Sequence, residues 1–398
     1  MLFNAVNKNW RLYCFIGALF LYGLWGSPTP NNPNWVEFTI ALLLILAVGG
    51  RDLYAAFKIS WKDKVENWRL TAQIFLIFGL SVPVMIAVLN GAPIDIIFRD
   101  IVGFVFLCLP LFIVPFLKRQ EGHSCLFINL CMMIGLMFAA RVLIPHFLLF
   151  RNTTELLYLA NSPLVLMSAL YLAAMAFYFL YQRVSLRTVI QALIYMSLAS
   201  IAIMAMFVDL QRASFLALAL SAFSLIIIGL MKAPMRMVAP IFVIVLSASF
   251  VAPYILDVMQ NVGLKTSQVG LNMRTQELLA VWDNLSASGW SILFGQGWGS
   301  SFASPAVGML NVTYTHSLLS YIFFKMGLVG LFLCLVYLFF IFEKLVRVYC
   351  TDPVKGTALI WPFIIPIFLY ASHKSFDFGL LLSLILLSAA LLHKEAKT

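Results

Sequence analysis

Three basic side chains carry the clearest indication of chemistry: Arg212, Arg274 and His316, each beside a long apolar stretch of the chain. Arginine is costly to place near a membrane interior, so such arginines tend to bind charged groups. A guanidinium pairs with two phosphate oxygens at once and needs no metal ion to do so. Histidine titrates near neutral pH and can accept a proton from a hydroxyl group. The side-chain types therefore indicate phosphate binding and general-base catalysis.

Each of the three also has a simpler interpretation. Arg212 could extend from a loop into water, Arg274 could be a solvated charge on a surface helix, and His316 could hydrogen-bond locally at a helix start. In the segment Asp209–Ser214, however, Asp209 lies three residues before Arg212 and can orient its guanidinium. Arginine is also disfavoured on the outer side of a membrane, where the charge pattern described below puts all three residues.

Other residues are placed to support these three. Ser317 follows His316 directly, and Gly327 and Gly330 follow eleven and fourteen residues after the histidine. Glycines at such spacing usually allow helices to pack closely in a membrane. Near the C-terminus, a further set of polar residues is a candidate lining of the same cavity: His373, Lys374 and Asp377.

A glycine-rich run lies between the Arg274 and His316 segments. Gly295 and Gly297 stand in Phe294–Gly299, which superficially looks like a phosphate-binding loop. No strand pattern precedes the run and no GK[ST] follows it, so a nucleotide fold is not predicted. We interpret it as a tight loop between a helix that starts near Arg274 and a helix that starts near His316.

Several catalytic motifs are missing from the sequence. It has no HExxH, no GxSxG, no Cys/His cluster and no Asp-x-Asp on the side predicted to face outward. Zinc proteolysis, serine hydrolysis and metal-dependent glycosyl transfer each need one of these arrangements. We therefore predict no metal and no cofactor.

The elements that must position these residues are membrane helices. The chain of 398 residues is 63% hydrophobic and 11% charged, with a mean hydropathy of +0.98. Soluble domains carry about 25% charged residues, and this much apolar surface can be covered only by lipid. The apolar runs are long and continuous, so helices are favoured over a barrel. We predict an all-α polytopic protein with about twelve transmembrane helices, at 12–26, 35–50, 70–89, 101–117, 126–145, 162–181, 189–207, 214–230, 237–255, 318–342, 357–372 and 376–392.

The links between these spans alternate in charge. Of the 26 Lys and Arg residues, 18 fall in one set of links and 8 in the other. Basic residues concentrate on the cytoplasmic side, so both termini are predicted to be cytoplasmic. The net charge of +10 is then an orientation signal and does not indicate nucleic acid. We predict one integral membrane domain over residues 1–398, with residues 257–315 as a periplasmic loop whose short helices pack on the outer face. The run 318–342, which contains Lys325, is expected to begin at the membrane surface before it crosses.

The motifs together resemble a known family. His316 and Ser317, nine further residues, and then Gly327–Gly330 resemble the signature of the bacterial O-antigen ligase family. Arg274 with Trp282, and then Phe294–Gly297, look like the arginine helix and glycine loop of the wider O-antigen ligase and polymerase superfamily. Asp209–Ser214 resembles the other arginine motif of that superfamily, with Arg212 as its arginine. The resemblance covers roughly residues 205–335.

The resemblance implies a GT-C-like fold and a metal-independent, inverting glycosyltransferase in lipopolysaccharide biosynthesis at the bacterial inner membrane. Its donor would be a glycan on undecaprenyl diphosphate, and its acceptor lipid A–core oligosaccharide. Arg212 and Arg274 would bind the donor diphosphate, and His316 would act as the base. Such a reaction fits the residues physically, because two guanidiniums can stabilise a departing diphosphate while an imidazole takes the proton of the attacking hydroxyl.

Two alternatives remain open. An O-antigen or capsular polysaccharide polymerase would use the same residues with a lipid-linked glycan as acceptor. A polysaccharide or lipid transporter or flippase belongs to another class and should show broken helices, charges at mid-membrane and a repeat between its halves. The sequence shows no such repeat, and the candidate charges gather near the predicted outer face.

Overall fold

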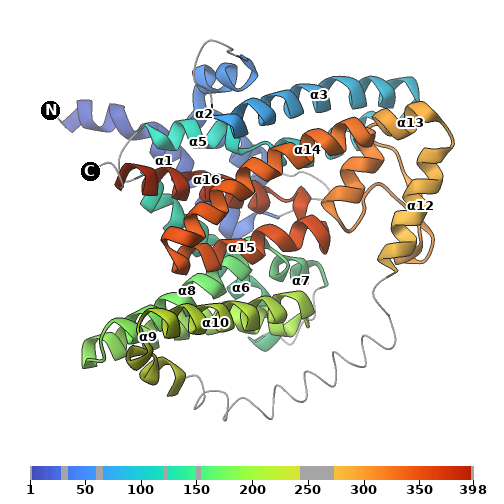
Figure 1. Cartoon of the computed structure of the whole chain (residues 1–398). Helices are drawn as coiled ribbons and strands as arrows, with labels where there is room; N and C mark the ends of the chain where they lie inside the picture. Colours follow the sequence, from blue (N-terminus) through green and yellow to red (C-terminus); the bar gives the residue numbers. More distant parts are fainter. Residues whose placement is uncertain are drawn as a thin grey trace. The chain divides into compact units, whose positions relative to one another are not determined.

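The computed structural model describes residues 2–27, 35–59, 66–119, 123–148, 154–242 and 273–395. These residues are almost entirely helical (Figure 1), which confirms the all-α prediction. The long helices are α1 (Leu2–Trp25), α2 (Trp35–Phe57), α3 (Asn67–Leu89), α4 (Ile94–Leu107), α5 (Pro110–Lys118), α6 (His123–Leu148), α8 (Pro163–Gln182), α9 (Leu186–Val208), α10 (Arg212–Lys232), α12 (Arg274–Ser286), α14 (Leu318–Thr351), α15 (Pro353–Phe368) and α16 (Phe376–Glu395). The short ones are α7 (Thr154–Ala160), α13 (Gly289–Phe294), η1 (Pro234–Met237), η2 (Pro305–Val307) and η3 (Ala371–Lys374).

Eight helices in the described part of the chain are long and apolar enough to cross a membrane. They coincide with eight of the twelve predicted spans. Three further predicted spans coincide with the shorter apolar helices 10–25, 353–368 and 376–392. Most of the predicted span 237–255 and part of the predicted loop 257–315 lie outside the described residues. A polytopic membrane protein is thus supported, and the count of twelve stays a prediction.

The chain forms two compact units. Unit 1 comprises residues 1–134, 273–347 and 363–398, and unit 2 comprises residues 135–272 and 348–362. In unit 1, α16 is buried on all sides, with Leu380, Leu381 and Leu382 fully inaccessible, and it packs on α4 and α5. A helix that is apolar around its whole circumference belongs in the interior of a bundle, so α16 is the central helix of unit 1.

Helix α14 is broken at Gly327, whose φ of 65° and ψ of −164° are not helical. In an unbroken helix the carbonyls of Phe324 and Lys325 would accept from amides four residues on. Here they accept instead from the amides of Gln296 and Gly297, at 2.9 and 3.1 Å. The glycine run after α13 therefore pairs with the broken turn of α14.

The same loop completes a second interrupted helix. Pro83 lies inside α3 and has no amide hydrogen, so the carbonyl of Gly79 lacks its usual helical donor. The indole Nε1 of the buried Trp298 donates to that carbonyl at 2.7 Å. The backbone amide of Trp298 also donates to the carbonyl of Pro83, at 3.2 Å. Two backbone defects inside apolar helices are thus satisfied by one loop, as burial away from water requires.

A two-stranded hairpin follows the glycine loop and was not predicted. Strand β1 (Phe302–Ser304) pairs antiparallel with β2 (Leu310–Val312), with Phe302 opposite Val312. Strands of three residues are too short to show an alternating pattern in a sequence. The hairpin packs on α12 through Phe302, which joins Val281, Leu285 and Phe324 in one apolar cluster.

In unit 2, α8 and α9 form a hairpin with α10 beside them (Figure 1). A capping box fixes the turn into α9: the Ser185 side chain accepts from the Thr188 amide, and the Thr188 side chain accepts from the Ser185 amide. Such caps satisfy amides that a helix start leaves without partners. Because η1, which follows α10 directly, also contacts α8, the three helices share one end at residues 183–185 and 233–237.

The break at Gly327 gives a stability prediction. A Cβ at this position would lie 2.4 Å from the backbone of Leu293 and Phe294, and the positive φ adds backbone strain. Gly327→Ala should lower the unfolding temperature of the purified protein, by an amount equivalent to at least about 2 kcal/mol. Gly91→Ala is the matched control, because Gly91 has a φ of +67° with nothing within 4 Å. Equal effects at the two positions would contradict a role for the close contact with α13.

Candidate functional site

The turn that carries His316 is fixed by hydroxyl groups at the start of α14. Ser317 precedes the helix, and its Oγ accepts from the amide of Ser320 at 3.1 Å. The Ser320 hydroxyl donates to Thr315 Oγ1 at 2.8 Å, and Thr315 Oγ1 donates to the carbonyl of Ser317 at 2.9 Å. Serine at this position caps the orphan amides of a helix start. His316 is therefore presented from a rigid turn, with a quarter of its side chain exposed.

The partner of His316 is Glu277. His316 Nδ1 lies 3.0 Å from Oε1 of Glu277 and 3.3 Å from Oε2. The backbone amide of His316 donates to Oε2 at 3.1 Å, and the Ser304 hydroxyl donates to Oε1 at 3.1 Å. A carboxylate on Nδ1 selects the tautomer with its proton on that atom, which leaves the lone pair on Nε2. The arrangement is that of a histidine base oriented by a buried carboxylate.

Helix α12 brings Glu277 to this position because its buried face repeats every four residues. Glu277, Val281 and Leu285 are buried, while the residues between them are half-buried or exposed. Val281 and Leu285 anchor the face in the apolar cluster with Phe302 and Phe324. Burial raises the pKa of the Glu277 carboxyl, but the hydrogen bonds from His316 and Ser304 outweigh it and leave the pKa below its usual value. Glu277 is therefore a carboxylate at neutral pH.

A second histidine and a lysine lie beside this pair. Lys374 Nζ is 4.0 Å from the ring centre of Tyr321 and 5.3 Å from that of Tyr314. The ring of Tyr314 is 5.9 Å from that of His316, and the ring of His373 is 5.2 Å from that of Tyr321. The structure thus brings three of the predicted residues, His316, His373 and Lys374, into one cluster of cations and aromatic rings.

The two histidines differ in what they can do. His373 is 1% exposed, and its Nδ1 lies 3.3 Å from the carbonyl of Tyr370. Burial, and then the charge of Lys374, lower the pKa of His373 to about 3. A histidine with so low a pKa is a poor proton acceptor near neutral pH. Of the two histidines, the more accessible His316 is therefore the candidate base.

Arg274 opens α12, three residues before Glu277. Its guanidinium donates to the carbonyl of Leu369 and lies 6.0 Å from the ring centre of Tyr370. Leu369 and Tyr370 directly precede η3, which carries His373 and Lys374. The link between α15 and α16 thus connects Arg274 to the cluster around His316.

A buried ion pair ties the glycine loop to this region. Lys325 Nζ, with no exposed area, lies 2.6 Å from Asp100 Oδ2 and donates to the carbonyl of Ser300 at 2.6 Å. The same Asp100 oxygen accepts from the amide of Gly299 at 2.9 Å. Charges taken out of water need such pairing and hydrogen bonds. The loop is therefore fixed to α4 and α14 by the contacts that neutralise the buried charge of Lys325.

The remaining predicted residues are placed as follows. Gly295 has a φ of +80°, and a Cβ there would lie 2.4 Å from the backbone of Lys325 and Met326. A Cβ on Gly297 would meet the Ala87 amide at 2.6 Å, and one on Gly330 would meet the Met326 side chain. Asp377, in the first turn of α16, accepts a hydrogen bond from the Tyr22 hydroxyl of α1. Gly295 and Gly297 allow two backbones to approach closely, Gly330 leaves room for the Met326 side chain, and Asp377 joins α16 to α1.

Arg212 and Asp209 belong to unit 2. Arg212 is the first residue of α10, and Asp209 Oδ2 accepts from the side-chain amides of Asn161 and Gln211 at 3.0 and 3.2 Å. Ser214 Oγ donates to Gln211 Oε1 at 2.8 Å. The turn between α9 and α10 is thus fixed by side-chain hydrogen bonds, with Asp209 at its centre.

In the parts of the chain that the structure describes, no group of three or more His, Cys, Asp or Glu side chains could hold a metal ion. Comparison with protein-family models finds no match, and no curated protein matches the chain.

The sequence interpretation assigned no role at this site to Glu277, Asp100 or Lys325, nor to the rings of Tyr314 and Tyr321. Glu277 lies one helical turn after Arg274, and an acidic residue so close to a candidate arginine was a usable signal. Lys325 and Asp100 stand in or beside apolar runs, where a charge requires a partner of opposite sign. The pairing itself joins residues 225 positions apart and has no local signature.

The cluster makes a pH prediction. Burial, and to a smaller extent the charges of Lys325 and Arg99, lower the pKa of Lys374 to about 7, although Asp100 opposes them. An anion bound beside Lys374 favours the protonated amine, so wild-type affinity for inorganic diphosphate should fall as pH rises through about 7. Lys374→Arg keeps its charge and should lose less affinity, measured by calorimetry between about pH 6.5 and 8.5.

Diphosphate itself titrates in this pH range, but its titration affects wild type and Lys374→Arg equally. The difference between the two proteins therefore reports on Lys374. Lys118→Arg serves as the control, because Lys118 pairs with Glu66 elsewhere in unit 1. Identical pH dependence in wild type and Lys374→Arg would show that Lys374 does not contact the anion.

The buried ion pair gives a prediction for stability. Asp100→Asn leaves the Lys325 ammonium buried without a countercharge and should cost about 3–5 kcal/mol, seen as a lower unfolding temperature. Lys325→Met should also destabilise, whereas the double variant should recover much of the loss because no unpaired charge remains.

Glu343→Gln is the control for this comparison. It removes an exposed partner of Arg347 and should change stability by less than about 1 kcal/mol. Additive losses in the double variant Asp100→Asn with Lys325→Met would contradict direct pairing.

Proposed function

We propose that the protein is an O-antigen ligase-like glycosyltransferase, which moves a glycan from undecaprenyl diphosphate onto lipid A–core oligosaccharide at the periplasmic face of the bacterial inner membrane. The observation that carries the proposal is the contact between Glu277 and His316, at 3.0 Å, in a cluster that also contains Lys374. A base, its orienting carboxylate and nearby cations are the parts that a metal-free transfer from a diphosphate needs.

In the proposed reaction, Nε2 of His316 takes the proton from a hydroxyl of the acceptor sugar. The hydroxyl oxygen attacks the anomeric carbon of the donor from the face opposite the diphosphate. The bond from that carbon to the phosphate oxygen breaks, and undecaprenyl diphosphate leaves with the electron pair. The proton on His316 then passes to water. Glu277 stabilises the imidazolium while it exists, as the carboxylate of a catalytic triad does.

The cations supply the second requirement, which is stabilisation of the leaving diphosphate. Arg274 is anchored on Leu369 and Tyr370, and Lys374 lies over Tyr314 and Tyr321. Aromatic rings hold a cation in place by the charge distribution of their faces. Arg212 of unit 2 is proposed as a further diphosphate ligand on the basis of its motif alone. Positive charge fixed beforehand costs no reorganisation as the leaving group develops charge.

A transporter would also contain broken helices and buried charges. In this protein α14 is a broken helix and Lys325 is a buried charge. In a transporter the opened backbone and the charges coordinate the cargo. Here the carbonyls freed at the break accept from Gln296 and Gly297, and Lys325 is paired with Asp100. These groups are already occupied by the protein itself, which favours an enzyme over a transporter.

The test of the base role is His316→Gln in the purified enzyme with a lipid-linked donor and an acceptor. Glutamine keeps a hydrogen-bonding side chain but cannot accept the proton, so turnover should fall about 10²–10⁴-fold with donor binding retained. His146→Gln, in α6, should leave turnover unchanged. Near-normal turnover of His316→Gln would exclude the base role.

A deletion strain separates the ligase from the polymerase. Loss of all long-chain lipopolysaccharide, with long glycans retained on undecaprenyl diphosphate, indicates the ligase. Lipopolysaccharide capped with a single repeat unit instead indicates the polymerase. Normal surface glycans with altered lipid or solute distribution would indicate a transporter.

A further inference from the structure

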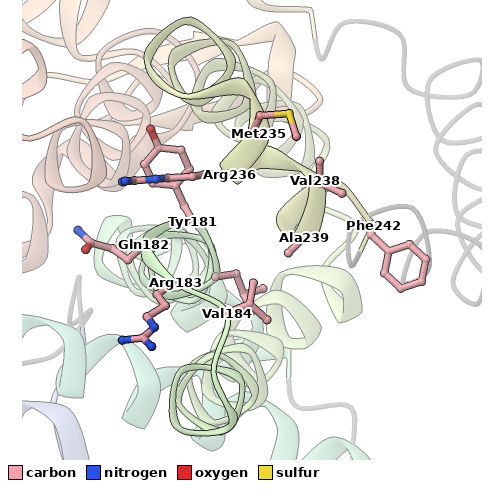
Figure 2. Close-up of a pocket in the computed structure, with 10 residues that line it drawn as sticks. Tyr181, Gln182, Arg183, Val184, Met235, Arg236, Val238, Ala239 and Phe242 are labelled. Carbon is pink, nitrogen blue, oxygen red and sulfur yellow. The ribbon is translucent and has the colours of Figure 1, made fainter.

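A pocket of about 510 Å³ opens at the shared end of α8, α9 and α10 in unit 2 (Figure 2). Its walls come from the end of α8 with the link to α9, and from the segment after α10. In the view of Figure 2, Gln182, Arg183 and Arg236 lie on one side of the pocket, whereas Val238 and Phe242 lie on the other. The pocket is therefore polar and basic on one side and apolar on the other.

The basic side carries charge that the surrounding chain does not neutralise. Within the described residues, neither the Arg183 nor the Arg236 guanidinium has a hydrogen bond or ion pair, and the pocket lining contains no acidic residue. From Asn161 to Phe242 the sequence has one acidic residue, Asp209. Asp209 stands at the opposite end of α9, a helix of 23 residues, and thus roughly 35 Å away. The pocket therefore suits an anion.

The apolar side shows what kind of anion fits. Val184, Val238 and Phe242 are 61%, 63% and 66% exposed although they line the pocket. A small soluble anion would leave these side chains uncovered, whereas an acyl chain would cover them. Helices α8, α9 and α10 are all long and apolar enough to span a membrane. Their shared end then lies at the depth of the lipid headgroups.

We propose that this pocket binds one anionic phospholipid, with Arg183 and Arg236 on its phosphate and an acyl chain along Val184, Val238 and Phe242. Guanidiniums bind phosphate oxygens through short, charge-assisted hydrogen bonds. Basic residues at the ends of membrane spans generally attract anionic lipids. A pocket additionally defines how many lipids bind and provides an apolar surface for the acyl chain. The site lies in unit 2 and is independent of the proposed catalytic function.

The test is native mass spectrometry of the purified protein in detergent, titrated with phosphatidylglycerol or phosphatidylcholine. Wild type should retain one phosphatidylglycerol and bind phosphatidylcholine at least about tenfold more weakly. Arg183→Gln and Arg236→Gln should each weaken phosphatidylglycerol binding about tenfold, the effect of one lost charge-assisted hydrogen bond. Arg187→Gln is the matched control, since Arg187 is exposed at the same helix end but does not line the pocket.

A further variant tests whether the apolar side of the pocket binds the acyl chain. Ala239→Phe fills the pocket and keeps both arginines, so it should also weaken lipid binding about tenfold. Equal affinity of the wild-type protein for both lipids would overturn the proposal, and this measurement requires no variant to fold. So would an Arg187→Gln effect as large as those of Arg183→Gln and Arg236→Gln, or unchanged binding in Ala239→Phe. Displacement of the lipid by millimolar inorganic phosphate would show a free-anion site instead.

Discussion

The constraint on which unit 1 depends is that no backbone polar group inside an apolar bundle can be left without a partner. Gly327 opens α14, and Pro83 removes a donor from α3. Each defect would cost several kcal/mol in an apolar environment if its carbonyl stayed unpaired. The glycine loop supplies the missing donors through Gln296, Gly297 and the indole of Trp298. The defects and the loop are therefore stable only together.

This mutual dependence explains how an apolar chain builds a polar site. Once the loop is fixed, the hairpin that follows it brings Ser304 to Glu277, and the chain enters α14 through the turn at Thr315–Ser317. His316 then meets a carboxylate that already has other hydrogen bonds. Asp100 and Lys325 fix the far side of the same loop. Catalytic side chains need such rigid support, because small displacements weaken proton transfer sharply.

The sequence indicated much of this and missed specific parts. The basic residues were found because arginine and histidine are rare beside apolar runs, and His316, His373 and Lys374 do lie in one cluster. Glu277 was not predicted as a site residue, because a single carboxylate on a helix of mixed polarity has the sequence pattern of a solvated surface charge. Asp100 could not be assigned, because its contact with Lys325 depends on how α4 packs on α14. The hairpin was missed because three-residue strands leave no periodic pattern.

The most direct test of the proposed catalytic pair is a double-mutant cycle on turnover with Glu277→Gln and His316→Ala in the purified protein. If Glu277 acts through His316, replacing it slows turnover by about 10²–10⁴-fold when His316 is present, but adds nothing once the imidazole is gone. The double variant should then turn over at the rate of His316→Ala alone. Losses that multiply across the two positions would show that Glu277 and His316 act separately, and would contradict the pair as the base of the reaction.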